Sequence, residues 1–191
     1  MRLFVALEID ATAARHIGEC MDDLRRRALE QAPQARISWV PIDRLHLTVR
    51  FIGEVDAARA ESIAIALKPR LAASRFRLAL DGVGAFPPRG APRVLWAGMT
   101  SDVAPLLALE QEVTARLAAG AVPPEQRPYQ PHLTLARVRD ASGLRSASLL
   151  EGFAQRRFGV SPVDAITLFQ SRVSPKGPTH VPLQRTPLHS S

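Results

Sequence analysis

The chain has 191 residues, of which 46% are hydrophobic and 23% are charged, so it is long and apolar enough for one buried core and is not typical of a disordered chain, despite 16 prolines. The net charge of +7 and the sequence pI near 11.0 indicate a surface that attracts polyanions, although a basic surface that only aids solubility is equally common. Cys20 is the only cysteine, which excludes an intramolecular disulfide and a thiolate metal cage.

The sequence of the first half of the chain predicts three extended segments and two helices. Asp10 and Asp56 are placed to cap helices, while Pro33 and Gly53 interrupt the patterns that precede them. Hydrophobic spacing predicts, in chain order, a strand at 2–9, a helix at 13–30, extended runs at 37–40 and 45–52, and a helix at 57–71.

The second half begins with a predicted strand pair at 76–83 and 93–99, joined by a basic, proline-rich loop at 84–92. The later pattern predicts a helix after Ser101 ending near Gly120, a proline-rich segment at 123–131, a strand at 132–138, a weak helix at 141–150, and strands at 163–170 and 179–183 around a turn at 174–178. This order indicates an α+β fold and lacks the regular alternation of a doubly wound parallel sheet. The sequence contains no glycine-rich phosphate loop.

One short phrase occurs twice, as His46-Leu47-Thr48-Val49 and as His132-Leu133-Thr134-Leu135, 86 residues apart. Side chains alternate across a strand, so in each copy the His and the Thr share one face while the Leu points to the other. A lone histidine on a strand is usually structural. Two copies on neighbouring strands would bring two imidazoles and two hydroxyls together.

Such a group of side chains suits in-line displacement at phosphorus. The ordinary histidine pKa of about 6.5 allows one imidazole to be neutral and the other protonated near neutral pH. One ring can then take a proton from the attacking water while the other protonates the leaving oxygen, and hydroxyl groups can donate to the non-bridging oxygens.

The sequence resembles the two-histidine (2H) phosphoesterase superfamily, and within it the bacterial RNA 2',3'-cyclic phosphodiesterase family, long called 2'-5' RNA ligase. The resemblance covers almost the whole chain. Beside the twin phrases it rests on Trp39-Val40, Phe51-Ile52-Gly53, Pro131 and Arg137, and on the segments Leu3-Phe4-Val5-Ala6, Phe86-Pro87, Val94-Leu95-Trp96-Ala97-Gly98 and Leu168-Phe169-Gln170-Ser171.

The resemblance implies a single bilobal domain over residues 1–191, with two antiparallel sheets facing a central cleft and helices outside. It implies hydrolysis of 2',3'-cyclic phosphates to 2'-phosphomonoesters without metal, and a weak reverse joining reaction. The expected partner is RNA with a 2',3'-cyclic phosphate end or a small cyclic nucleotide, and the protein is expected to be a monomer without a cofactor. His46 would protonate the leaving 3' oxygen and His132 would accept the proton of water. Thr48 and Thr134 would bind the phosphate.

Two arginines follow the phrases. Arg137 matches a phosphate-binding arginine of the family, but strict alternation places it on the opposite face from Thr134, so that a bulge or a strand end must intervene if it serves there. Arg50 shares the face of His46 by parity, and it is predicted either to reach an RNA phosphate or to remain solvated.

Other side chains are weaker candidates. The family usually has Tyr near the C-terminus where this chain has His180, which is predicted to be structural or at the rim of the site. Four aromatic side chains could stack a base but are more often core residues: Trp39, Phe51, Trp96 and Tyr129.

Three alternatives stay open. A zinc hydrolase lacks acidic ligands at the usual spacing from either histidine, a non-catalytic RNA- or nucleotide-binding module would not need both phrases intact, and a phosphodiesterase acting on 2'-5' oligoadenylate or cyclic ADP-ribose phosphate would keep the same chemistry. The N-terminal apolar run is too short for a signal peptide and no stretch is long enough to span a bilayer, which predicts a cytoplasmic protein.

Overall fold

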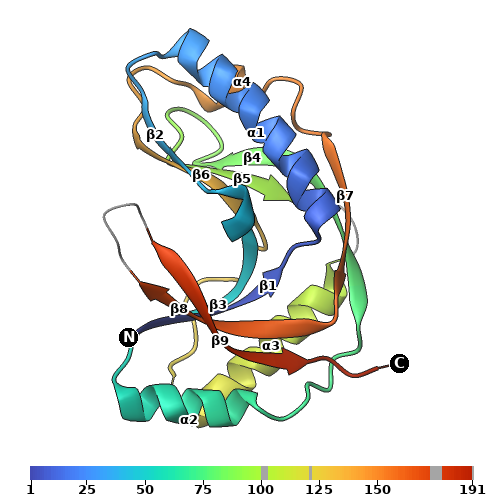
Figure 1. Cartoon of the computed structure of the whole chain (residues 1–191). Coiled ribbons are helices and arrows are strands. Elements are labelled where there is room, and N and C mark those ends of the chain that lie inside the picture. The colour runs from blue at the N-terminus through green and yellow to red at the C-terminus, as the bar shows by residue number, and fades with distance from the viewer. Residues whose placement is uncertain (100–102, 121, 173–177, 191) are drawn as a thin grey trace.

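The computed structural model describes residues 1–99, 103–120, 122–172 and 178–190 (Figure 1). The described chain forms nine strands, four α-helices and one 3₁₀ helix. In chain order they are β1 (Arg2–Glu8), α1 (Ala11–Gln31), β2 (Arg36–Trp39), η1 (Ile42–Arg44), β3 (His46–Glu54), α2 (Ala57–Leu67), β4 (Phe76–Phe86), β5 (Val94–Gly98), α3 (Ala104–Ala119), β6 (Leu133–Asp140), α4 (Ser146–Leu150), β7 (Arg157–Val163), β8 (Ala165–Arg172) and β9 (Thr179–Pro187).

The named strands pair antiparallel throughout, in the order β7-β4-β5-β6-β3-β1-β8-β9, with β2 added beside β6. One residue pair, Leu47 with Leu133, joins the half that contains β6 to the half that contains β3. The predicted α+β class is therefore confirmed, and the two sheets expected from the resemblance are two halves of one sheet that meet at this pair.

Helices cover the two halves separately. Figure 1 shows α1 and α4 beside the half that contains β4 to β7, and α2 and α3 beside the half that contains β1, β3, β8 and β9. The Asp10 carboxylate accepts hydrogen bonds from the amides of Thr12 and Ala13, and the Asp56 carboxylate accepts one from the amide of Arg59, so both predicted caps are confirmed.

Two helices are shorter than predicted. Helix α2 ends at Leu67 rather than at residue 71, because Pro69 cannot continue the helical hydrogen bonding. Helix α4 covers only 146–150 of the predicted 141–150, because Ser142 and Gly143 have φ values of +43° and +89°, in the left-handed region.

The strands also differ from the prediction. Strand β4 continues through Gly84 to Phe86, into the predicted loop. A Cβ at residue 84 would lie 2.1 Å from the Trp96 ring, so only glycine lets the strand pass this close to the indole. Strand β7 was missed, because Gly159 and Pro162 weaken its pattern. Strand β9 continues to Pro187, and four of the five residues of the predicted turn, 174–177, lie outside the described residues.

Apolar side chains divide between two clusters. The large core contains Leu47, Leu133 and Leu135 together with the apolar faces of α1, α2 and α3. A small cluster of Phe4, Ala6 and Phe169 lies on the opposite face of β1 and β8. The ring of Phe4 is 5.0 Å from that of His46, so the small cluster borders the first of the two repeated phrases.

Candidate active site

The two repeated phrases lie side by side where β3 meets β6. Leu47 and Leu133 are Cα partners in an antiparallel pair, and both are fully buried in the core. Antiparallel register then sets His46 opposite Thr134 and places His132 opposite Thr48, on the face away from the buried leucines. In an ideal antiparallel pair the two histidines would be diagonal neighbours, with Cα atoms about 7–8 Å apart. We call this face of β3 and β6 the motif face.

Each phrase contains a bulge at the same position, its last residue. Thr48 pairs with Ala6 and Arg50 with Val5, so Val49 is an extra residue in β3. Each bulge shifts the alternation by one residue, so the fourth residue after each histidine turns to the core and the fifth returns to the motif face.

The bulge in β6 decides the position of Arg137. Thr134 pairs with Trp96 and Arg137 with Val94, two residues of β5 that share a face, so Leu135 is the extra residue. Arg137 therefore shares the motif face with Thr134. This bulge is the irregularity that the sequence pattern required if Arg137 is to lie on that face. The positive charge of Arg137 is one of the causes that lower the pKa of His46.

The bulge in β3 sends Arg50 the other way. Arg50 is 5% exposed, donates to the Pro123 carbonyl at 2.6 Å and pairs with Glu125 at 3.6 Å. The prediction that Arg50 shares the face of His46 is therefore wrong, because parity counting ignores an extra residue. Phe51, 45% exposed, occupies the place on β3 that corresponds to Arg137 on β6.

Both imidazoles are held by the same backbone contact. The Nδ1 atom of His46 lies 2.8 Å from the Arg44 carbonyl oxygen, and the Nδ1 atom of His132 lies 2.7 Å from the Gln130 carbonyl oxygen. A carbonyl oxygen can only accept, so each Nδ1 carries the hydrogen and each Nε2 is left to exchange a proton with a ligand.

Burial sets the charge state of His46. Burial lowers its pKa most, the hydrogen bond to Arg44 acts in the opposite direction, and the charge of Arg137 lowers the pKa further. With a net shift below the ordinary value, His46 is mostly neutral at pH 7 when no anion is bound.

Aromatic rings orient the two histidines. The Phe4 ring is 5.0 Å from His46, and the Phe86 ring is 5.3 Å from His132 in an edge-on contact. Phe86 also lies 5.3 Å from Trp96. Each histidine thus packs against a phenylalanine, from the adjacent strand β1 for His46 and from β4, two strands away, for His132, which restricts the rotation of its ring.

Tyr129 ties the two motif strands together. Its hydroxyl donates to the backbone carbonyl of Thr48 at 2.9 Å, and burial raises its pKa. Sequence reasoning considered Tyr129 only as a ring that could stack a base. No local pattern in the sequence marks its contact with β3, because the two residues are 81 positions apart.

A cavity of about 770 Å³ opens beside His46. Phe4, Phe169 and His180 line it together with His46, and it continues past Arg44 towards the start of α1. His180, predicted to be structural or at the rim, lies with its ring 5.0 Å from that of His46.

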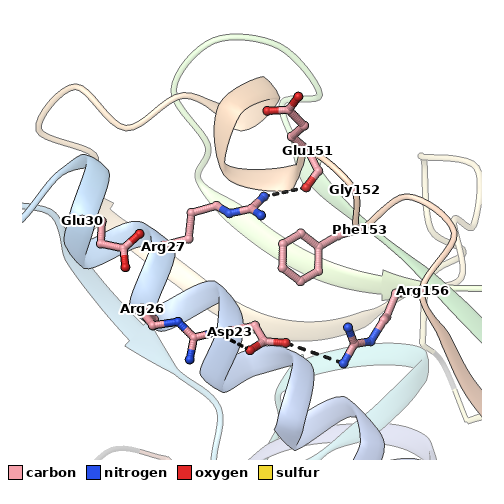
Figure 2. Close-up of a pocket in the computed structure, with 8 residues that line it drawn as sticks. All are labelled: Asp23, Arg26, Arg27, Glu30, Glu151, Gly152, Phe153 and Arg156. Atoms are coloured by element: carbon pink, nitrogen blue, oxygen red, sulfur yellow. Dashed lines mark hydrogen bonds and ion pairs between the residues drawn. The ribbon is translucent and has the colours of Figure 1, made fainter.

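A second cavity, of about 380 Å³, lies away from the repeated phrases, between α1 and the turn that carries Glu151 and Phe153. Figure 2 shows Asp23 paired with both Arg26 and Arg156, at 2.7 and 3.6 Å, and Arg27 donating to the Glu151 carbonyl. Because Asp23 pairs with two of the arginines and Arg27 is bonded to backbone carbonyls, this cavity is not a candidate for phosphate binding.

The described ranges contain neither a cluster of metal-ligating side chains nor a membrane-spanning helix. Within residues 1–99, 103–120, 122–172 and 178–190, no three His, Cys, Asp or Glu side chains are grouped as ligands of one metal ion. In the same part of the chain, no helix has the length and apolar character needed to cross a membrane.

An antiparallel sheet with two paired His-x-Thr strands defines a two-histidine phosphoesterase, the class predicted from the sequence. Residues 10–174 match the family model described as the 2'-5' RNA ligase superfamily, and the chain belongs to this family.

Known relatives agree with this assignment. The chain is 35% identical over 153 residues to an RNA 2',3'-cyclic phosphodiesterase of Aeropyrum pernix, covering 78% of this chain and 85% of the relative. It is 36% identical over 191 residues to one of Thermus thermophilus, with 97% and 89% covered. Among solved structures, TT0787 of Thermus thermophilus superposes with a TM-score of 0.78 at 28% identity, covering 98% and 97% of the two chains. The apo form of E. coli LigT superposes at 0.73 and 27%, covering 98% and 96%.

Proposed function

We propose that this protein is an RNA 2',3'-cyclic phosphodiesterase that opens the cyclic phosphate at RNA ends to a 2'-phosphomonoester. The observation that carries the proposal is the pairing of Leu47 with Leu133, which sets two His-x-Thr phrases on one face. The hydrogen bonds at both Nδ1 atoms leave both Nε2 atoms for proton exchange. Relatives at 35% and 36% identity carry the name of this activity.

The reaction needs one proton acceptor and one proton donor. A water oxygen forms the new bond to phosphorus while the bond from phosphorus to the ribose 3' oxygen breaks. Nε2 of His132 takes a proton from the water, and Nε2 of His46 gives a proton to the leaving oxygen. The two histidines end in exchanged protonation states, and solvent restores them. General acid and base each contribute about 10²- to 10⁴-fold in rate.

Three further side chains support the phosphate. The hydroxyls of Thr48 and Thr134 lie on the motif face and donate to non-bridging oxygens as negative charge develops there. Arg137 supplies a positive charge to the same oxygens. A bound phosphate would also offset the charge of Arg137, which removes one of the two causes that lower the pKa of His46 and favours its protonated, donor form.

The same groups can serve a joining reaction. When a ribose 5'-hydroxyl attacks the phosphorus in place of water and the 3' oxygen leaves, a 2'-5' linkage forms, so we expect a weak joining activity. We also propose that residues 1–191 form one domain, because the two halves share strand pairing and one continuous core. We propose separately that this domain acts as a monomer. The reaction needs no metal in this scheme, since every proton and charge is handled by a side chain.

The test uses a short RNA ending in a 2',3'-cyclic phosphate, incubated with the protein in the presence of EDTA. We expect conversion to the 2'-phosphate only, and loss of turnover in His46→Ala and in His132→Ala. His16→Ala is the matched control, because His16 lies on α1, bonds the Phe158 carbonyl and is not on the motif face. Inhibition by EDTA, a 3'-phosphate product, or wild-type rates in either motif variant would refute the proposal.

A further inference from the structure

A third histidine stands beside the first imidazole. His180 pairs with Ser171 in β9 and β8, and its ring centroid is 5.0 Å from that of His46, with the two rings nearly perpendicular at 82°. The Phe4 ring is 4.9 Å from His180 and 5.0 Å from His46. One phenylalanine therefore contacts both imidazoles.

One nitrogen of His180 has no partner. Its Nδ1 atom is buried and makes no hydrogen bond within the described part of the chain. An unpaired buried polar atom destabilises a fold, whereas a phenyl ring would occupy the same space without that cost. His46 and His132, in contrast, both bond a backbone carbonyl through Nδ1. Packing alone therefore does not account for an imidazole at position 180.

His180 lines the cavity that opens beside His46. His180, His46 and Phe4 all line the cavity of about 770 Å³. Arg44 lines it as well, and its guanidinium donates to the Pro178 carbonyl at 2.9 Å, at the start of the segment that carries His180. Glu8 and Asp43 also line the cavity, so its polar groups suit a ligand that can both donate and accept hydrogen bonds, such as a ribose.

We propose that His180 is a substrate-binding residue, which hydrogen-bonds the terminal nucleotide on the His46 side of the phosphorus. This inference rests on the proposed function, because it places the leaving side of the cyclic phosphate next to His46. It means that β9, and not only the two repeated phrases, contributes a residue that binds the substrate.

His180 binds as a neutral ring. Burial lowers its pKa, and the charges of His46 and Arg44 lower it further. The contact is therefore a hydrogen bond between neutral imidazole and a nucleotide oxygen or hydroxyl, not an ion pair. An asparagine amide, which is also neutral and can place a polar atom near the position of Nδ1, is the conservative replacement.

The test compares His180→Phe with His180→Asn on two substrates, 2',3'-cyclic AMP and a short RNA with a 2',3'-cyclic phosphate end. We expect His180→Phe to raise KM roughly tenfold for both substrates, with a smaller change in kcat. His180→Asn should restore much of the loss. The melting temperature of His180→Phe should be equal to or above that of the wild type, because the unpaired nitrogen is gone.

Each outcome separates the two proposals. A wild-type protein that leaves both substrates intact overturns the proposed function itself. Normal wild-type turnover with an unchanged KM in His180→Phe overturns only the inference about His180, as does a raised KM for the RNA alone, since the contact would then lie beyond the terminal nucleotide. A lower melting temperature with unchanged KM would show a structural residue. His189→Phe, outside the cavity, is the control for loss of a histidine.

Discussion

The two halves of the site share a backbone and differ in the side chains around it. Each half has the His-x-Thr phrase, the carbonyl two residues before the histidine that binds Nδ1, and an extra residue after the threonine. The next residue on the motif face, five positions after each histidine, is Phe51 on β3 and Arg137 on β6. Strand geometry therefore makes the two histidines alike, and their neighbours make them different.

The neighbours also differ in polarity. Phe4 and a third imidazole contact His46, whereas Phe86 of β4 contacts His132 and also lies 5.3 Å from Trp96 of β5. Burial and a nearby guanidinium lower the pKa of His46. Two nearly identical sequence phrases thus place their imidazoles in different surroundings.

The largest expected effect tests whether the two halves act as one unit. His46→Ala or His132→Ala should each lower kcat for the cyclic phosphate about 10³-fold or more, because acid and base each supply part of one concerted proton exchange. The double variant should lose little more than either single variant, measured by single-turnover kinetics. Losses that multiply would contradict a shared step and would favour two independent contributions.

The next largest effect on kcat/KM is expected from the residues five positions after each histidine, Arg137 on β6 and Phe51 on β3. Arg137→Ala should lower kcat/KM about 10²-fold, since it removes a charged donor to the phosphate. Phe51→Leu, the matching change on β3, should alter kcat/KM much less. Equal losses in steady-state assays of the two variants would show that the guanidinium has no special role.

Arg50 provides the contrast on the opposite face. Arg50→Ala should destabilise the fold by about 2 kcal/mol, because it leaves the Pro123 carbonyl without its charged donor. Chemical denaturation measures this loss, and kcat/KM of the folded variant should stay within about twofold of the wild type. A catalytic defect without a change in stability would place Arg50 on the motif face after all.

The smallest effect is a shift in the titration of His46. Arg137→Gln should raise the pKa of His46, because it removes a positive charge that disfavours the protonated ring. In the substrate-free protein the protonated fraction of His46 should therefore increase at a given pH. NMR titration of the imidazole measures this change. Arg50→Gln is the control, and a fall in the pKa of His46 in Arg137→Gln would contradict the assigned electrostatic contact.

Local chemistry was sufficient for much of the fold. Capping carboxylates at Asp10 and Asp56, helical spacing in α1 and α3, and the apolar runs of β1 and β8 are properties of neighbouring residues, and the structure confirms them. The missed strand β7 has a glycine and a proline in its pattern. Its strand conformation depends on pairing with β4, which lies far from it in the sequence.

By itself the sequence determined the two His-x-Thr phrases, the family, and which face each His and Thr share, because alternation over three residues needs no partner strand. Tertiary structure alone decided the positions of Arg50, Arg137 and His180. A bulge exists only relative to the register of a neighbouring strand, so the reversal of the two arginines could not be counted from parity. Likewise, the contact between His180 and His46 arises because β9, β8, β1 and β3 lie next to one another in the sheet.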